Sequence, residues 1–208
     1  MNRRRLLELY EEFGAKLTEL HTWYLDSIIG YAALYERLRT HQEKLKTFLG
    51  DHEFAAEDFQ NTLGITYKDV SSFDFQPAST SPVMKQGELL HRVKKDGQNT
   101  ILLGQQCIVA AYSYWEKYLR KEIEEALNRK VKCDFWGDMR HLRNSIVHDN
   151  GIASPHVSKC KIITWFKPLD VIALDHEKMH SIFMHMAKFR NEIHACSLPP
   201  QNAIHVSN

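Results

Sequence analysis

Apolar residues recur every three or four positions along the first 38 residues of the chain, which predicts a helix. The members of this series are Leu6, Tyr10, Phe13, Leu17, Leu20, Tyr24, Ile28, Tyr31, Leu34 and Leu38. Gly14 and Gly30 interrupt it, and each weakens a helix interior by about 1 kcal/mol relative to alanine, so we expect one kinked helix or two helices. Since strict heptad spacing is not kept, packing within the chain is favoured over a coiled coil with a partner.

The pattern changes between Gly64 and Thr100, where turn-forming residues and two prolines replace the helical spacing. We expect a connecting region or flap here, with the PASTSP sequence at residues 77–82 in an exposed loop. The LLHRVKK sequence at residues 89–95 fits either a short helix or a strand.

Helical spacing returns at Ile101 and continues to about residue 130, with Asn99 or Thr100 available as the N-cap. The apolar side of this helix contains Leu102, Ile108, Ala111, Trp115, Leu119, Ile123 and Leu127. A shorter helix is expected within the FWGDMRHLRNSIVHD sequence, residues 135–149, with Asp134 or Asp138 as its N-cap. Asn150 and Gly151 would end this helix, because both tolerate a left-handed backbone.

The IITWF sequence at residues 162–166 and the DVIALD sequence at residues 170–175 are strand candidates, and Pro168 between them suggests a small β-hairpin. Asp175 is expected to cap a last helix, and the tail from Leu198 to fray. The expected fold class is therefore all-α, with a long N-terminal helical region and this hairpin inserted after the 135–149 helix. Its segments are 1–63, 64–100, 101–197 and 198–208, arranged as one compact domain.

Composition limits the kinds of partner that the chain can bind. Lys and Arg number 27 against 26 Asp and Glu, so the formal net charge is +1 and nucleic acid would have to be bound at a local site. The start of the chain lacks the apolar core of a signal peptide, and no run of about 18 apolar residues is present. The four cysteines lack CxxC spacing. We therefore expect a cytoplasmic protein that does not contact membranes.

The sequence RNSIVHDNG at residues 143–151 holds the residues with the most specific chemistry. Arg143 can bind phosphate oxygens through a two-pronged donor geometry, and His148 can move a proton near neutral pH. At about 100° per residue, Asn144 and His148 share a helical face. These groups suit metal-free RNA cleavage, in which the 2′-hydroxyl attacks the adjacent phosphate. The alternative is an exposed helix end in which His148 interacts favourably with the helix dipole.

The motif resembles the R-x4-6-H motif of the HEPN superfamily, because Arg143, Asn144, three further residues and His148 end a short helix. A long helix containing YWEKYLR precedes it, and the resemblance covers roughly residues 100–196. It implies a compact helical bundle, usually dimeric, in which two motifs face one cleft. Many such proteins are metal-independent endoribonucleases of toxin–antitoxin or phage-defence systems. By resemblance Arg143 and His148 would be catalytic, Asn144 would support them, and Glu116 is similar to a polar residue often found nearby.

The resemblance implies RNA as the substrate, no cofactor, a homodimer, and an antitoxin or a defence-complex protein as a further partner. Some members of the superfamily keep the fold but only bind RNA or a protein, so a catalytically silent binding module is the alternative function. His141 lies near the motif but is expected to be an ordinary surface residue.

A second motif, HEKMH at residues 176–180, matches the H-E-x-x-H pattern of zinc hydrolases. In that pattern His176 and His180 would bind Zn²⁺ and Glu177 would activate water. Lys178 inside the turn departs from it, and Met186 occupies the position of a third histidine ligand. A favourable first helical turn explains Glu177 as well, so the zinc hydrolase stays a lesser alternative.

Overall fold

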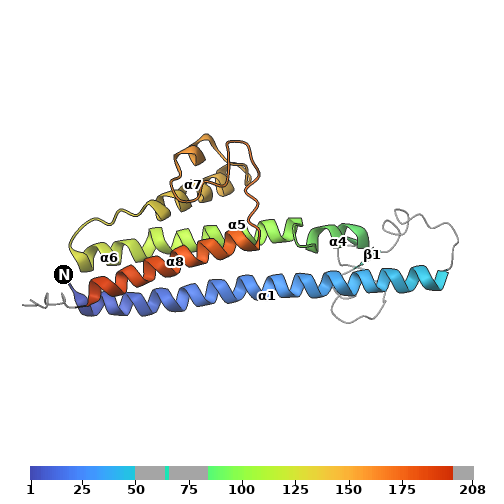
Figure 1. Cartoon of the computed structure of the whole chain (residues 1–208), viewed down its shortest axis with the longest axis horizontal. Coiled ribbons are helices and arrows are strands. Elements are labelled where there is room, and N and C mark those ends of the chain that lie inside the picture. Colours follow the sequence, from blue (N-terminus) through green and yellow to red (C-terminus); the bar gives the residue numbers. More distant parts are fainter. Residues whose placement is uncertain (50–63, 66–83, 199–208) are drawn as a thin grey trace, which may run out of the picture. The chain divides into compact units, whose positions relative to one another are not determined.

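The computed structural model describes residues 1–49, 64–65 and 84–198, and these ranges are mainly helical (Figure 1). This confirms the all-α class. The chain divides into two compact units, Met1–Tyr24 with Leu103–Asn208, and Leu25–Leu102. The predicted 77–82 loop, and the predicted tail beyond Leu198, lie outside the described residues.

The N-terminal apolar series forms one helix, α1 (Arg3–Leu49), rather than two. Gly14 lies inside it and is buried against the other end of the chain, since an added Cβ would lie 2.5 Å from Cζ of Arg190. The Arg190 guanidinium uses this space to donate from Nε to the Tyr10 carbonyl at 3.0 Å. Gly14 is therefore a point of close approach and does not end the helix.

The predicted central helix consists of three consecutive segments: α5 (Gln98–Tyr114), the π-helical turn η1 (Trp115–Leu119) and α6 (Arg120–Leu127). Asn128 ends α6 with a left-handed backbone, at a φ of 54°. The predicted N-cap was wrong, because α5 begins at Gln98 and Asn99 and Thr100 lie in its first turn. Thr100 donates its hydroxyl to the Lys94 carbonyl at 3.4 Å.

The motif helix is α7 (Asp134–His148). Its N-cap is Cys133 and makes no side-chain bond, so the prediction that Asp134 or Asp138 caps the helix was wrong. Its end was predicted correctly, because Asn150 and Gly151 have φ values of 53° and 77° just after it. A 3₁₀ turn, η2 (Pro155–Lys159), follows.

The predicted hairpin after α7 is not formed, because residues 162–166 have no strand structure and only an isolated antiparallel bridge joins Ile152 to Val171. Ile163 and Phe166 are buried in the core. Their burial explains the apolar residues of this segment, which do not alternate across a sheet. The last helix, α8 (His176–Ser197), begins after Asp175, whose side chain accepts a bond from the Lys178 backbone at 2.9 Å, as predicted.

Within the first unit, the start of α1 runs antiparallel to α8 and also to the η1–α6 segment (Figure 1). Tyr10 contacts His194 while Tyr24 contacts His176, which fixes the direction of α8. The aromatic centre joins four helical segments through Trp115, Trp136, Phe189 and Phe13.

The two indoles of this centre, from η1 and α7, are stacked at 4.7 Å between ring centroids, and Phe189 of α8 meets both edge to face. Trp115 and Trp136 are each only 3% exposed. Burial of such large side chains is among the strongest stabilising contributions available to a domain of this size.

The second unit contains the rest of α1, the helix α4 (Gln86–Val93), and the short antiparallel strands β1 (Gly64–Ile65) and β2 (Met84–Lys85). Leu38, Leu89 and Val93 form its apolar cluster. Residues 89–93 of the LLHRVKK sequence are thus helical, so the helix alternative was correct and the strand alternative was wrong.

Two glycines of the first unit should respond in opposite directions to alanine. Gly151 has a positive φ, and an added Cβ would lie 2.4 Å from Nε2 of Gln105, which is buried and donates to the Ile172 carbonyl. We expect Gly151→Ala to lower the free energy of unfolding by roughly 1–3 kcal/mol.

Gly137 is the matched control, since it lies exposed inside α7 with no atom within 4 Å of an added Cβ. Gly137→Ala should raise the free energy of unfolding by about 0.5–1 kcal/mol. Urea unfolding followed by circular dichroism would measure both, and equal stability of the two variants would contradict the role given to Gly151.

Candidate functional site

Arg143 is held in one position by residues of its own helix and of the preceding one. Its Nη1 donates to Oδ1 of Asn144 at 2.9 Å, and its Nη2 lies 3.9 Å from Oε2 of Glu116. The guanidinium carbon lies 5.8 Å from the ring centre of Tyr112. The Nε atom is buried and has no acceptor among the described residues. Three of the sequence-predicted site residues, Arg143, Asn144 and Glu116, are therefore brought together.

Tyr112 completes this cluster and was not identified from the sequence. Its hydroxyl donates to Oε1 of Glu116 at 3.1 Å. Burial, followed by the negative charge of Glu116, raises the pKa of Tyr112, so the phenol stays a neutral donor. Glu116 lies in the π-helical turn η1, and such turns occur frequently at functional sites.

His148 is the last residue of α7 and is exposed. It lies four positions after Asn144, so the two residues share a helical face. In the described part of the chain it makes no hydrogen bond or ion pair with Arg143. A single chain thus presents a fixed arginine and a separate, solvent-accessible histidine.

The HEKMH residues are placed differently. His176 is the first residue of α8, and its ring stacks on Tyr24 with centroids 6.4 Å apart. His180 and Glu177 are exposed. No group of three or more His, Cys, Asp or Glu side chains in the described ranges is arranged to hold a metal ion. The motif therefore finds no third ligand among those residues.

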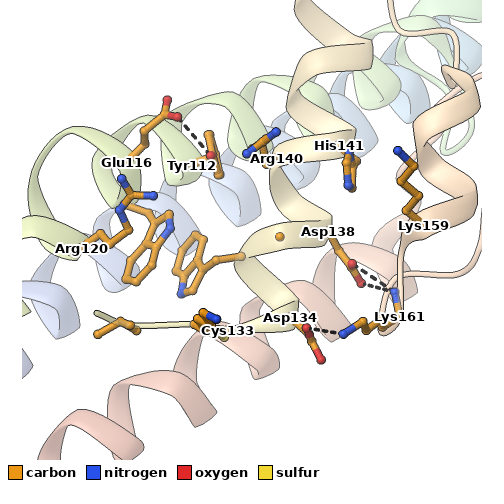
Figure 2. A pocket seen from close by; sticks show the side chains of 15 residues that line it. Tyr112, Glu116, Arg120, Cys133, Asp134, Asp138, Arg140, His141, Lys159 and Lys161 are labelled. Carbon is orange, nitrogen blue, oxygen red and sulfur yellow. Dashed lines mark hydrogen bonds and ion pairs between the residues drawn. The ribbon is translucent and has the colours of Figure 1, made fainter. Parts of the chain in front are cut away.

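A cleft of about 420 Å³ opens beside the arginine cluster (Figure 2). Tyr112, Glu116 and Arg120 form one wall, while residues of α7 and Lys159 and Lys161 form the other. Tyr112 and Glu116 also contact Arg143, so the cleft and the motif share a wall. The stacked indoles of Trp115 and Trp136 belong to its lining.

Basic residues at the cleft were missed by sequence reasoning. Arg120, Lys132, Arg140 and Lys159 lie up to 39 positions apart (159 − 120) and come from different elements. One usable signal was the spacing of four between Arg140, Asn144 and His148, which places them along one face of α7.

Asp138 fixes the second wall of the cleft. Its side chain is 3% exposed, and its carboxylate accepts a backbone N–H bond from Lys161 at 3.0 Å (Figure 2). It also accepts backbone N–H bonds from Ile162 at 2.6 Å and Ile163 at 2.9 Å. The segment that was predicted to be a strand therefore satisfies its donors with a side chain of α7. This contact positions Lys161 and the turn η2 before it.

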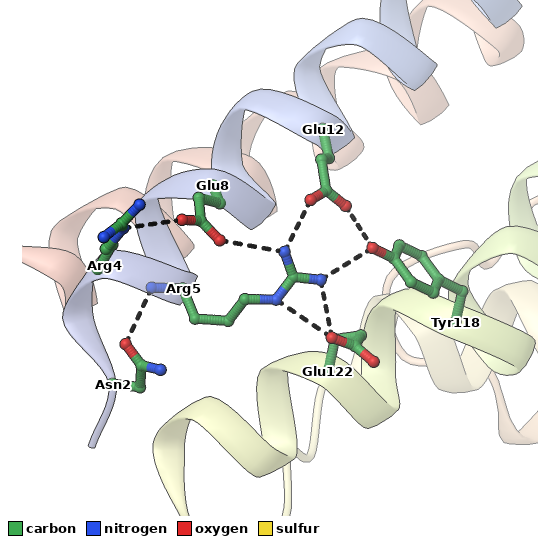
Figure 3. Close-up of polar contacts among 7 residues, drawn as sticks. All are labelled: Asn2, Arg4, Arg5, Glu8, Glu12, Tyr118 and Glu122. Carbon is green, nitrogen blue, oxygen red and sulfur yellow. Dashed lines mark hydrogen bonds and ion pairs between the residues drawn. The ribbon is translucent and has the colours of Figure 1, made fainter.

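A second polar cluster in the first unit is centred on Arg5 (Figure 3). Its guanidinium donates to Glu122 at 2.7 Å, to Tyr118 at 2.9 Å and to Glu12 at 2.8 Å, and Tyr118 in turn donates to Glu12. The bond to Glu122 is the main cause that raises the pKa of Arg5. These bonds join α1 to η1 and α6. Arg5, Glu12 and Glu122 are paired with one another, so the cluster leaves none of these charges free for a ligand.

Comparisons with protein-family models, with curated proteins and with solved structures gave no match to this chain. None of the helices in the described part is both long and apolar enough to cross a membrane.

Asp138→Asn should destabilise the fold, because the amide has one acceptor oxygen where the carboxylate has two: with that oxygen on the three backbone donors, its NH2 group would face the Lys161 N–H that Oδ1 now accepts. We expect the free energy of unfolding to fall by roughly 2–4 kcal/mol, measured by urea denaturation. Asp134→Asn is the control, because that carboxylate is 58% exposed and meets only the Lys161 ammonium. A change above about 0.5 kcal/mol in the control would exceed what an exposed pair contributes.

The Arg5 cluster should make stability depend on pH. The bond from Tyr118, and then the contacts with Arg5, lower the pKa of Glu12, while burial opposes the shift. The stabilisation is therefore complete above the pKa of an unfolded glutamate and is lost as pH falls through the lower folded value. Glu12→Gln should cost on the order of 1 kcal/mol at pH 7 and progressively less at acid pH.

The measurement is the difference in unfolding free energy between wild type and Glu12→Gln from pH 7 to pH 3. Glu125→Gln is the control, because this side chain is 63% exposed and meets only Lys121 at 3.8 Å. A Glu12→Gln difference that stays constant with pH would contradict the assignment.

Proposed function

We propose that this chain is a HEPN-type, metal-independent endoribonuclease. The observation that carries the proposal is the position of Arg143, which is held by Asn144, Glu116 and Tyr112 and precedes the exposed His148 by five residues on α7. An arginine fixed in this way loses little conformational entropy when it binds phosphate. The all-α fold is compatible with a HEPN-like bundle.

The proposed reaction breaks one bond to phosphorus and forms another. The ribose 2′-oxygen attacks the adjacent phosphorus and loses its proton to a base, while the 5′-oxygen leaves and takes a proton from an acid. The products are a 2′,3′-cyclic phosphate and a 5′-hydroxyl. Arg143 would stabilise the extra negative charge on the phosphoryl oxygens, and His148 would move one of the two protons.

The second proton requires a second group, and His148 has no proton-transfer partner among its described neighbours. A homodimer that brings two motifs together would supply it, with the His148 of each copy acting on one substrate. The resemblance to HEPN proteins favours this arrangement, and also an antitoxin or defence-system protein as the partner that restrains the activity.

Cleavage in the absence of free metal ions is the direct test. Wild type, Arg143→Ala and His148→Ala would be incubated with mixed RNA in excess EDTA, and the fragment ends analysed by mass spectrometry. We expect wild type alone to release cyclic phosphate ends, with activity reduced at least about a hundredfold in both variants. Arg3→Ala and His180→Ala serve as matched controls, because both side chains are exposed and lie outside the motif.

Each other outcome has a definite meaning. Equal cleavage by wild type and His148→Ala would refute the proposed site. RNA binding without cleavage would favour a catalytically silent module. Activity that EDTA abolishes and that Glu177→Gln and His180→Ala remove would instead establish the zinc hydrolase.

A further inference from the structure

The charges around the cleft do not balance locally. Its lining contains five basic side chains, Arg120, Lys132, Arg140, Lys159 and Lys161, and three acidic ones, Glu116, Asp134 and Asp138. All three acids have partners: Glu116 meets Arg143 and Tyr112, Asp134 meets Lys161 at 2.9 Å, and Asp138 accepts backbone bonds.

Four of the five cations have no ion pair in the parts of the chain that the structure describes. These four, Arg120, Lys132, Arg140 and Lys159, are all exposed. A cleft lined by charges of one sign attracts a ligand of the opposite sign more strongly than a flat surface does. The excess is local, since the whole chain carries a formal charge of only +1.

The placement of these cations favours an extended anion over a single one. Arg120 belongs to α6, Lys132 to the link before α7, Arg140 to α7 and Lys159 to η2. Figure 2 shows Arg120 on one side of the cleft and Lys159 on the other, with Arg140 and His141 between them. A chain of phosphate groups running through the cleft would meet cations from both walls.

Helix α7 links the cleft to the motif, since Arg140 lines the cleft and Arg143 follows three residues later on the same helix. Arg140, Asn144 and His148 are spaced by four along α7, so they follow one another on the same helical face. On the opposite wall Tyr112 and Glu116 contact Arg143 directly. A strand bound along Arg140 would therefore be led toward Arg143 and His148.

The floor of the cleft contains Gly137, an exposed residue in the middle of α7. No atom lies within 4 Å of an added Cβ, so neither backbone conformation nor packing requires a glycine. Gly30 of α1 is equally open, so an unpacked helical glycine alone indicates no site. At residue 137, however, the open position belongs to the lining of the cleft, so a side chain placed there would add its charge to that lining.

We propose that this cleft is a binding track for the backbone phosphates of single-stranded RNA, which delivers the strand to Arg143 and His148. The inference rests on the proposed function, because it assigns the substrate path of the same site. Single strands are favoured because cations face the ligand from both walls, which a narrow chain can satisfy and a duplex cannot.

Binding can be measured separately from cleavage. Every variant would carry His148→Ala, and fluorescence anisotropy would follow a labelled 12-nucleotide single strand over a range of salt concentrations. Gly137→Glu places a negative charge on the cleft floor, and we expect it to raise the Kd at least about tenfold. Gly30→Glu makes the same chemical change at an equally open helical glycine and should leave the Kd unchanged.

Removal of the cations tests the phosphate contacts directly. Arg140→Ala with Lys159→Ala should weaken binding at least about tenfold and reduce the slope of log K against log salt by about 1.4, since each lost contact contributes roughly 0.7 on a single strand. Arg3→Ala with Lys188→Ala removes the same charges from exposed positions outside the cleft and should change the slope little. Circular dichroism would confirm that every variant is folded.

The outcomes separate this inference from the proposed function. Loss of RNA binding in the cleft variants but not in the control variants supports the track, even if the wild-type chain cleaves no RNA. RNA cleavage by the wild-type chain, together with equal RNA binding by the cleft and control variants, would overturn the track but would keep the proposed nuclease activity. Absence of RNA binding at low salt, or equal binding of a duplex of the same sequence, would also overturn it.

Discussion

The stack of Trp115 on Trp136 is the contact on which the geometry of the first unit depends. It joins η1 to α7, and Phe189 closes it from α8 at a right angle to both rings. The residue after Trp115 is Glu116, which contacts Arg143, and the residue after Trp136 is Gly137, which lies on the cleft floor. The two walls of the cleft are therefore set by the two largest buried side chains, whose position is fixed by packing rather than by hydrogen bonds.

The three acidic side chains of the cleft lining have structural partners, while four of its five basic side chains form no ion pair with the residues that the structure describes. Asp138 uses its carboxylate on three backbone donors, so it organises the segment after η2 without any sheet. Glu12 of α1 and Glu122, in the first turn of α6, are paired with the Arg5 guanidinium. A nearly neutral chain can thus hold a basic cleft, because the acids of the cleft lining are bound within the fold while four of its cations are exposed.

The sequence predicted the features that depend on spacing along one helix. Regular apolar spacing identified α1 and the α5–α6 region, and Asp175 marked the start of α8 as its N-cap. Asn150 with Gly151 marked the end of α7 because their backbone is left-handed. The family resemblance suggested that Glu116 lies near the motif, and its carboxylate is 3.9 Å from Arg143. The hairpin was wrong because buried apolar residues in an irregular segment have the composition of a strand, and Asp138 gave no sign that it would bind that segment. The cleft depends on residues from separate elements, which no local pattern reveals.

The π-helical turn at Trp115–Leu119 has a consequence for how this helix tolerates changes of length. Such a turn holds one more residue than an α-helical turn would, so side chains beyond it are rotated by about 100° relative to those before it. Tyr112, before the turn, contacts Arg143, whereas Glu122, beyond it, contacts Arg5. Deleting one residue between Tyr112 and Glu122 would leave a regular α-helix, which could keep either the contact with Arg143 or the contact with Arg5 but not both. The extra residue is therefore what allows a single uninterrupted helix to serve α1 and α7 at the same time.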